Sequence, residues 1–401
     1  MVEVCSFCGK KIGRVEKMIK NPRNNIYICD NCIRTCMSLI SKDDDDSNGE
    51  TKATGGFLDG IDGLSPRQIH HELDRFIIGQ EYAKKVLSVA VYNHNKRLHD
   101  PSGLIKKSNI LLAGPTGCGK TLLAKTLAKM LGVPYVITDA TKLTEAGYIG
   151  DDVEICLQNL IDAADGDIEL AQRGIVYIDE IDKIARTGEG RSISRDVSGE
   201  GVQSSLLKLV EGCEVSIPVH SRKKIANGES IMFNTLNVLF IVGGAFEGLF
   251  NESKTKTIGF GTDDLEMVDA DKVANEKLTE ESLKKYGMMP ELVGRFPVLC
   301  ALTELKEDDL VRILTEPEDA ITKEYQLLFE KDNVKLTYDE DALREMAKIA
   351  IAKNTGARGL RSIIEDVMLD VMYDIPDREN VKEVIVTKDS ITSKKVKIIE
   401  K

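Results

Sequence analysis

The sequence predicts an α/β fold in which helices cover both faces of a parallel sheet, making three layers, followed by a small, mainly helical C-terminal domain. Short apolar runs rich in β-branched residues alternate with helical patterns, as in buried parallel strands; the runs are residues 110–113, 135–139, 176–179 and 238–242. Beyond about Leu302 the pattern changes to helices, and five of the nine cysteines lie in the first 36 residues. We therefore expect four parts, at residues 1–40, 41–63, 64–302 and 303–401.

The first part is a cysteine module with two Cys-x₂-Cys pairs that are separated by 20 residues, Cys5 with Cys8 and Cys29 with Cys32. The number of cysteines is odd and the chain begins with no secretory signal, so a disulfide framework is disfavoured. Four thiolates at this spacing are typical of a closed tetrahedral site, which predicts one structural zinc ion per chain. Unmetallated thiols are the alternative. Cys36 lies outside the spacing, and the isolated cysteines are expected to be ordinary core residues; they are Cys156, Cys213 and Cys300.

Residues 41–56 show no apolar periodicity and include four consecutive aspartates, which predicts a flexible acidic linker. A helix is then expected from Ser65 and Pro66, because serine caps helix N-termini and proline fits the first turn. The segment Ile77-Ile78-Gly79-Gln80 follows, and after it a long amphipathic helix through Val86 and Tyr92.

A phosphate-binding loop is predicted directly after the strand at 110–113 and before a helix at 121–131. The sequence fits G-x-x-x-x-G-K-[ST], a pattern whose glycines turn the backbone so that several N–H groups point into one concavity at a helix N-terminus. Lys120 is expected to reach the β- and γ-phosphates and Thr121 to offer its hydroxyl to Mg²⁺. Cys118 is expected to contribute its backbone. The predicted nucleotide-binding residues here are Gly114, Pro115, Thr116, Gly117, Cys118, Gly119, Lys120, Thr121 and Leu122.

Two acidic residues follow the strand at 176–179, where they would meet the phosphate loop at the carboxyl edge of the sheet. Asp179 is expected to hold the metal, and Glu180 to orient and activate the attacking water. Together the two motifs predict ATP hydrolysis. The alternative, a chance glycine-rich turn beside a charged strand end, does not account for the match in residue type, order and context.

The overall charge and hydropathy exclude other classes of protein. The formal net charge of −12 argues against nucleic-acid binding as the main activity. No apolar run approaches the ~18 residues of a membrane span, and the first residues resemble neither a secretory nor a transit peptide. We expect a cytoplasmic protein.

The C-terminal part predicts helices at residues 307–326, 339–354 and 357–372 and strands at 381–388 and 396–399. These elements complete the small domain. No serine, histidine and acid set suggests peptidase chemistry.

These features together resemble the ClpX family, the zinc-binding AAA+ unfoldases of the Clp/Hsp100 group that serve the ClpP peptidase. The resemblance runs from about Cys5 to residue 387 and includes further motifs at 147–150, 258–260, 294–295 and 356–361. It implies a homohexamer that uses ATP, Mg²⁺ and Zn²⁺ to unfold tagged or unfolded proteins and thread them into ClpP, that also acts as a stand-alone chaperone, and that accepts adaptors. No nucleic-acid or membrane partner is implied.

The resemblance also assigns nucleotide-site roles that the residues alone leave open. Arg295 matches the arginine finger that completes a neighbour's site, so the implied catalytic residues are Lys120, Glu180 and Arg295. Arg358 matches the second sensor, which touches the nucleotide of its own subunit. Ile78 would pack near the adenine. Without the resemblance, a solvated surface charge is the favoured interpretation of each arginine, and Ile78 is a plain core residue. No first-sensor residue can be placed, because the strand at 238–242 runs into two glycines.

Substrate-gripping and docking residues are implied by resemblance as well. Tyr148 and Ile149 stand where the family has its aromatic pore loop, Arg195 and Val197 where it has the second loop, and Arg222 where it has the entrance loop. The entrance loop departs from the family's Arg-Lys-His, because lysine replaces the histidine and removes a titratable imidazole. The docking motif is Ile258, Gly259 and Phe260, whose two apolar side chains are expected to be exposed anchors for a ClpP cleft. The alternative for the pore loop is a buried tyrosine in an ordinary turn. The alternative for residues 258–260 is a loop folded back onto its own core.

Three other functions remain as alternatives at this point. A nucleic-acid remodelling ATPase would need basic residues and exposed aromatics together in the zinc module or pore. A pure adaptor would need a broken catalytic acid or finger, whereas Glu180 and Arg295 are present. The related HslU family lacks both the zinc module and the motif at 258–260.

Overall fold

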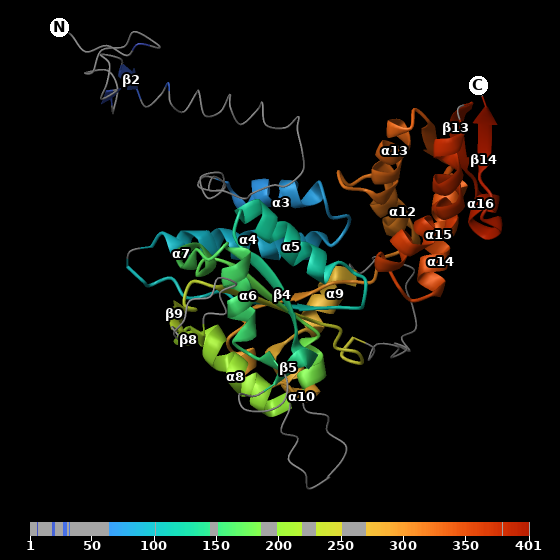
Figure 1. Cartoon of the computed structure of the whole chain (residues 1–401). Coiled ribbons are helices and arrows are strands. Elements are labelled where there is room, and N and C mark those ends of the chain that lie inside the picture. Colours follow the sequence, from blue (N-terminus) through green and yellow to red (C-terminus); the bar gives the residue numbers. More distant parts are fainter. Residues whose placement is uncertain are drawn as a thin grey trace, which may run out of the picture. The chain divides into compact units, whose positions relative to one another are not determined.

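The computed structural model describes residues 6, 18–20, 27–29, 32, 64–100, 102–144, 151–185, 199–218, 230–250, 270–378 and 380–400 (Figure 1). The chain divides into two compact units, Met1–Gly55 and Gly56–Lys401, which are described separately.

In the first unit, two short strands place one of the predicted zinc ligands, Cys29. Strands β1 (Met18–Lys20) and β2 (Tyr27–Cys29) run antiparallel, with Met18 opposite Cys29. Cys29 is fully buried. The Ser6 backbone N–H donates to the Tyr27 carbonyl over 2.7 Å, and the Tyr27 N–H donates to the Ser6 hydroxyl over 3.1 Å. The residue beside Cys5 is therefore tied to the strand that ends at Cys29. Cys5, Cys8 and Cys36 lie outside the described residues.

The second unit begins with the predicted helix pair, α3 (Pro66–Asp74) and α4 (Glu81–Leu98). A capping box starts α3: the Gln68 N–H donates to the Ser65 hydroxyl and the Ser65 N–H donates to the Gln68 side chain. The prediction of a Ser-capped helix followed by a long helix is confirmed.

A five-stranded parallel sheet forms the centre of this unit, in the order β11, β3, β10, β7 and β4. The strands are β3 (Ile110–Ala113), β4 (Tyr135–Asp139), β7 (Ile175–Asp179), β10 (Leu239–Gly244) and β11 (Val298–Ala301). Four of these match the predicted apolar runs. Strand β11 was not predicted, and it pairs with β3 at one edge of the sheet.

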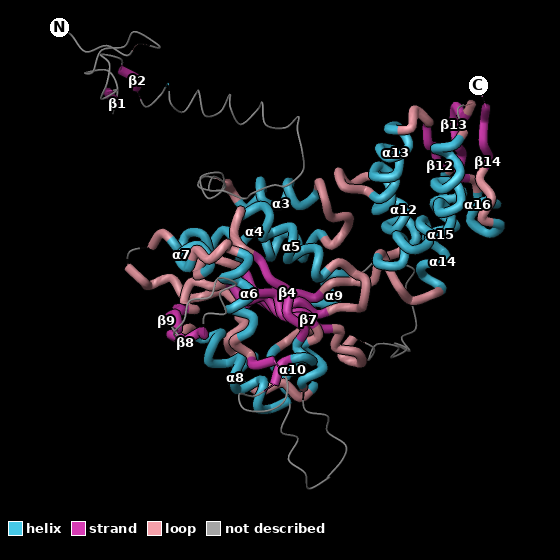
Figure 2. The backbone as a smooth tube through the Cα atoms, in the orientation of Figure 1, coloured by secondary structure: helices cyan, strands magenta, loops and turns pink. Residues whose placement is uncertain are grey.

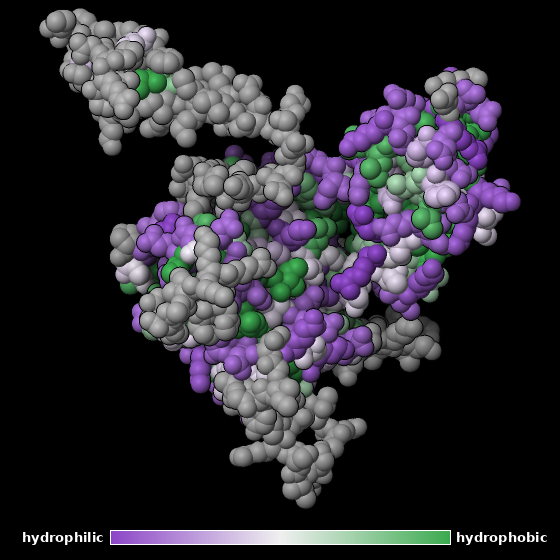
Figure 3. Space-filling view, viewed as in Figure 1, coloured by the Kyte–Doolittle hydropathy of each residue, from purple (hydrophilic) through white to green (hydrophobic). Residues whose placement is uncertain are grey.

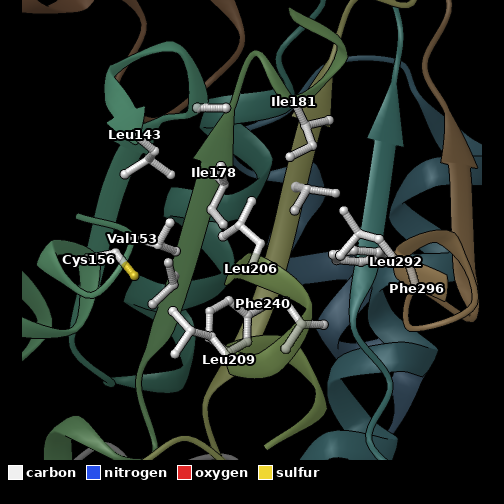
Figure 4. Packing of buried hydrophobic residues seen from close by; sticks show 14 of the residues in the cluster. Leu143, Val153, Cys156, Ile178, Ile181, Leu206, Leu209, Phe240, Leu292 and Phe296 are labelled. Atoms are coloured by element: carbon white, nitrogen blue, oxygen red, sulfur yellow. The ribbon is translucent and has the colours of Figure 1, made fainter. Parts of the chain in front are cut away.

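Apolar side chains alternate between the two faces of the sheet, and each face carries its own core. Ile110, Tyr177 and Ile241 pack against α3, α4 and α5 (Lys120–Leu131). Ile178 and Phe240 pack on the other face with Leu206 and Leu209 from α8, which spans Gly199–Glu211 (Figure 4). Figure 2 shows helices on both sides of β4 and β7, so the predicted three-layer α/β fold is confirmed.

Shorter elements complete the large part of the unit: η3 (Ala140–Lys142), β5 (Leu143–Thr144), β6 (Asp151–Asp152), α6 (Ile155–Ala163), α7 (Ile168–Ala171), η4 (Ile181–Ile184), β8 (Glu214–Pro218), β9 (Ser230–Asn234), α9 (Ala270–Lys277), α10 (Glu280–Tyr286) and α11 (Pro290–Val293). Cys156 and Cys300 are fully buried, as expected for core residues. Cys213 is half-buried at the edge of the core.

The C-terminal part contains α12 (Glu307–Thr315), α13 (Ile321–Lys331), β12 (Lys335–Tyr338), α14 (Glu340–Ala352), α15 (Arg358–Asp374), η5 (Ile375–Asp377), β13 (Val381–Val386), α16 (Lys388–Ser393) and β14 (Lys397–Glu400). Its helices share a third hydrophobic core with a small sheet in the order β12, β13, β14.

One predicted element of this part was wrong. A single helix was expected over residues 307–326, but α12 ends at Thr315 and α13 begins at Ile321. The break occurs at Pro317, which has no N–H to donate and disfavours helical backbone in the residue before it. Strand β12 was also missed, and the strand expected at 381–388 ends at Val386, where α16 follows.

Among the described residues, none of the helices has the length and apolar character that crossing a membrane requires. On the face shown in Figure 3, hydrophilic side chains dominate and hydrophobic ones form small separate patches.

A buried histidine lies on α4 near the N-terminal edge of the sheet. His94 is 3% exposed, and neither of its ring nitrogens has a hydrogen-bond partner in the described part of the chain. Burial, with Arg97 and Lys107 nearby, lowers the pKa of His94 from 6.5 to about 3. The unfolded chain therefore binds a proton here between these values while the folded chain does not, so the free energy of unfolding falls as pH drops through that interval.

We expect His94→Leu to raise the melting temperature, because it removes a buried polar ring without a partner, which costs about 1–3 kcal/mol. The gain should be larger at pH 5 than at pH 7.5, since leucine cannot take up the proton that favours the unfolded chain. Calorimetric melts at both pH values test this, with the exposed His71→Leu as control. A variant that melts below the parent at both pH values would show that His94 is stabilising.

Candidate nucleotide site

The phosphate-binding loop connects β3 to α5 and lies beside the C-terminal part of the same unit. Gly117 has a φ of +79°, and a Cβ there would lie 2.5 Å from the carbonyl oxygen of Thr355. The Ala357 N–H donates to the Gly117 carbonyl over 3.3 Å. Only glycine permits both this backbone conformation and this approach. The loop is thus in direct contact with the segment that precedes α15.

The Lys120 side chain is held within the loop. Its Nζ donates to the carbonyl oxygens of Gly114 over 2.6 Å and Pro115 over 2.9 Å, and the residue is 9% exposed. The N-cap residue of α5, Gly119, has a left-handed φ of +102°. The first N–H groups of α5 have no partner within the helix, so they can bind an anion.

Asp179 is the best-connected side chain of the site. Its Oδ2 accepts a hydrogen bond from the Thr121 hydroxyl over 3.2 Å, and its Oδ1 accepts from the Tyr177 hydroxyl over 3.1 Å and the Glu180 N–H over 3.0 Å. A hydroxyl and a carboxylate oxygen this close are ligands that suit Mg²⁺. The residues present therefore fit a magnesium ion between β7 and α5.

Tyr177 was not predicted as a site residue, because in the sequence it stands as one apolar residue of a buried strand. It is fully buried, and burial raises the pKa of its hydroxyl, so the proton stays available for Asp179. A Cβ at Gly243 would lie 2.1 Å from the Tyr177 oxygen, so the neighbouring strand must carry glycine there. Its position two residues before Asp179 was the available signal, because such residues share one face of a strand.

Asp182 was also missed, and it shapes the loop after β10. Its two carboxylate oxygens accept hydrogen bonds from the N–H groups of Ala245 over 3.1 Å and Phe246 over 3.3 Å. Phe246 adopts a left-handed φ of 48°. Glu247, the next residue, lines the cavity described below. Glu247 is therefore a polar side chain that this loop brings to the site. It follows β10, the strand after which no first-sensor residue could be predicted.

A cavity of about 360 Å³ collects these groups and lies within the size range of ligand pockets, about 300–1,000 Å³. Glu180, with a left-handed φ of 56°, projects from the end of β7 and lines it. Arg358, the first residue of α15, lines it from the C-terminal part. The full lining is Thr116, Gly117, Gly119, Lys120, Thr121, Leu122, Asp179, Glu180, Asp182, Lys183, Ala245, Glu247, Ala357 and Arg358.

Four predicted binding residues do not line this cavity; they are Ile78, Gly114, Pro115 and Cys118. Cys118 is buried, and burial raises the pKa of its thiol. Together with Pro115 it lines a neighbouring cavity of about 260 Å³, which shares Thr116 and Gly117 with the first one. Ile78 is buried but lines neither cavity. Its neighbour Gln80 reaches the site indirectly: the side chain donates to the carbonyls of Cys118 over 3.5 Å and Thr303 over 2.9 Å.

Arg295 lies away from the cavity of its own chain. Its Nη2 pairs with the Glu211 carboxylate over 2.5 Å, and its side chain is 52% exposed. The described cavity is therefore lined without Arg295. The remaining predicted site residues lie outside the described residues; they are Tyr148, Ile149, Arg195, Val197, Arg222, Ile258, Gly259 and Phe260.

A second group of potential metal ligands is accounted for by an internal cation. His70, Asp74 and Glu81 approach one another near the start of α4. The buried Lys84 ammonium donates to Asp74 and, over 2.7 Å, to Glu81. Since the same lysine ammonium already donates to both carboxylates, this group forms an ion-pair network.

Family models match three segments of the chain. Residues 3–42 match the ClpX C4-type zinc finger, residues 105–299 the AAA domain (Cdc48 subfamily), and residues 305–388 the C-terminal, D2-small domain of ClpB protein. The zinc-finger match covers all four predicted zinc ligands, and the AAA match covers the phosphate loop, Asp179, Glu180 and Arg295.

The chain is also similar over nearly its whole length to curated proteins. Two relatives, from Borrelia duttonii (strain Ly) and Borrelia recurrentis (strain A1), are 48% identical over 404 aligned positions, which cover 98% of this chain and 92% of theirs. A third, from Treponema denticola, is 46% identical and covers 99% of this chain and 97% of its own. All three are described as the ATP-dependent Clp protease ATP-binding subunit ClpX.

Proposed function

The chain belongs to the ClpX family of AAA+ ATPases, and from this premise we propose that it unfolds proteins with the energy of ATP hydrolysis and threads them into a ClpP-type peptidase ring. We propose further that it acts alone as a chaperone. The observation that best supports an ATP-driven machine is the cavity in which Thr121, Asp179, Glu180 and Arg358 meet. In this cavity, residues at the end of the central sheet and the start of α5 meet the cationic side chain of Arg358 from the C-terminal part.

Binding of the triphosphate follows from the groups around the loop. Backbone N–H groups at the start of α5 cradle the phosphates, and Lys120 exchanges its two loop carbonyls for the β- and γ-phosphate oxygens. Thr121 and Asp179 hold Mg²⁺, with Tyr177 and the Glu180 N–H fixing the orientation of the carboxylate. When bound, Mg²⁺ neutralises charge that develops on the phosphate oxygens.

Hydrolysis requires a base and a further cation beside the γ-phosphate. Glu180 lines the cavity and carries a carboxylate that can orient a water molecule and accept its proton. Arg295 is partly exposed and does not line its own cavity, so we propose that it completes the cavity of an adjacent copy in a homohexamer. Hydrolysis then depends on assembly.

Arg358 gives the nucleotide a means of moving the C-terminal part. It is the first residue of α15, and the segment before it contacts Gly117 of the phosphate loop. Loss of the γ-phosphate removes a charge that Arg358 can bind, and so changes the preferred position of α15 relative to the loop. We propose that this change drives the mechanical step.

Residues outside the described part supply the remaining functions in this proposal. Tyr148 and Ile149 grip the substrate chain, and Arg195, Val197 and Arg222 line its path. Ile258, Gly259 and Phe260 dock into clefts of the peptidase ring. Cys5, Cys8, Cys29 and Cys32 hold one structural zinc ion, which the hydrogen bonds between Ser6 and Tyr27 support by bringing the two pairs together.

The deciding experiment is ATP-dependent degradation of a stable fluorescent protein that carries an unstructured C-terminal tag. We expect fluorescence to fall when the chain, ATP and a ClpP ring are all present, and to persist with ADP or without the ring. A series of tags is needed because the entrance loop departs from its family. Brisk ATP hydrolysis without loss of fluorescence for any tag would contradict the unfoldase proposal.

A further inference from the structure

Asn109 makes an unusual set of hydrogen bonds at the edge of the sheet opposite the phosphate loop. It is 2% exposed and directly precedes β3. Its Nδ2 donates to the carbonyl of Arg295 over 3.1 Å and to the carbonyl of Val210 over 3.3 Å, and its Oδ1 accepts from the N–H of Phe240 over 3.2 Å. One buried amide thus joins α8, β10 and the backbone of Arg295.

The side chain of Arg295 is held from the same helix. Glu211 follows Val210 at the end of α8, and its carboxylate binds Nη2 of Arg295 over 2.5 Å. Both side chains are partly exposed, at 52% for Arg295 and 40% for Glu211. In the described part of the chain, Glu211 is the only acid paired with this guanidinium. A guanidinium has five N–H donors, so most of them stay available for a phosphate.

We propose that Asn109 and Glu211 are positioning residues that fix Arg295 for the nucleotide site of the adjacent subunit. This inference rests on the proposed role of Arg295 as an arginine finger. Asn109 sets the position of the backbone, and Glu211 sets the direction of the side chain. Because an arginine loses much rotamer freedom when it binds, a finger that is already oriented keeps more of its binding energy for the transition state.

Alternative reasons for the pair are weaker. An ion pair between partly exposed side chains contributes little to stability, so folding does not explain it. Asn109 also ties the finger to the site of its own chain, since β3 leads from Asn109 directly to Gly114, and the Val298 N–H donates to the Asn109 carbonyl over 3.4 Å. The same strand that carries the phosphate loop at one end therefore holds the finger at the other.

The first test compares steady-state ATP hydrolysis by assembled rings of Glu211→Gln, Glu211→Asp and the parent. Because a misplacement of about 1 Å can cost ~100-fold in rate, we expect kcat to fall at least ~10-fold for Glu211→Gln with KM changed less than ~2-fold. Glu211→Asp, which keeps the charge, should recover part of the rate. Glu214→Gln removes an exposed carboxylate nearby and should change neither constant. Unchanged kcat in Glu211→Gln would overturn the proposal.

The second test asks whether the defect acts on the neighbour. Glu211→Gln subunits, whose own cavity is intact, are mixed with excess Glu180→Gln subunits, whose finger is intact. The reference is parent chain mixed with Glu180→Gln at the same ratio. We expect the rate per Glu211→Gln subunit to rise to that reference, because most of its cavities then face an intact finger. A persistent defect in mixed rings would place the role of Glu211 within its own subunit and refute the inference.

Asn109→Asp gives an independent variant that keeps the side-chain shape but loses both N–H donors. It should show the same loss of kcat and the same recovery in mixed rings, and a melt establishes that it folds. If it does not fold, the Glu211 variants decide. Arg295→Ala separates this inference from its premise. A normal rate of ATP hydrolysis in Arg295→Ala would refute the finger role of Arg295. A loss of rate in Arg295→Ala with no loss in Glu211→Gln would refute only the positioning roles.

Discussion

Glu180→Gln is expected to reduce ATP hydrolysis by at least ~100-fold, the usual contribution of a positioned general base. Glutamine keeps the length and shape of the side chain at a position with a left-handed φ of 56°, so the turn after β7 should persist. It cannot accept a proton from water at neutral pH. Phosphate release at saturating ATP measures the loss.

Nucleotide binding and ring assembly should survive in this variant. Lys120, Thr121 and Asp179 are unchanged. Residue 180 donates to Asp179 through its backbone N–H, which glutamine also provides. Titration with a fluorescent ATP analogue and sedimentation measure binding and assembly. Glu169→Gln, on the exposed side of α7, is the matched control and should hydrolyse ATP normally. Hydrolysis by Glu180→Gln at more than a tenth of the parent rate would assign the base to another group, and Glu247 would be the next candidate.

The parts of this site that could be predicted are those that lie close together in sequence. The phosphate loop and the two acids after β7 follow from local patterns, since a strand, a glycine turn and a helix start occupy consecutive residues. The helix break at Pro317 was missed although its cause is local, since proline cannot continue the hydrogen-bond ladder.

The parts that could not be predicted depend on contacts between distant residues. Asp182 supports a loop more than 60 positions later, through the N–H groups of Ala245 and Phe246. Asn109 binds the carbonyl of Arg295 across 186 positions. Both contacts follow from the strand order, which places β7 beside β10 and β11 beside β3, and no local pattern encodes that order.

Tyr148→Ala is expected to abolish unfolding of a stable substrate while the ring continues to hydrolyse ATP. Tyrosine offers a large amphipathic surface that can grip a polypeptide without reading its sequence, and alanine does not. In the sequence, Tyr148 falls between β5 and β6, two short strands that pair in parallel, with Leu143 opposite Asp151 and Thr144 opposite Asp152. Loss of fluorescence from a tagged stable protein, measured together with phosphate release, tests the prediction.

The described structure gives a physical reason to expect that motion at the nucleotide reaches Tyr148. Leu143 precedes Tyr148 in the sequence and Val153 follows it. Both belong to the same hydrophobic core as Ile178 and Ile181, which flank Asp179 and Glu180 (Figure 4). Because such a core is close-packed, we expect a shift at the end of β7 to displace Leu143 and Val153 as well. Ile149→Val, which removes one methylene beside the tyrosine, is the control and should unfold substrate nearly as well as the parent. If Tyr148→Ala rings unfolded the substrate at the parent rate, the force would have to reach the substrate through other residues.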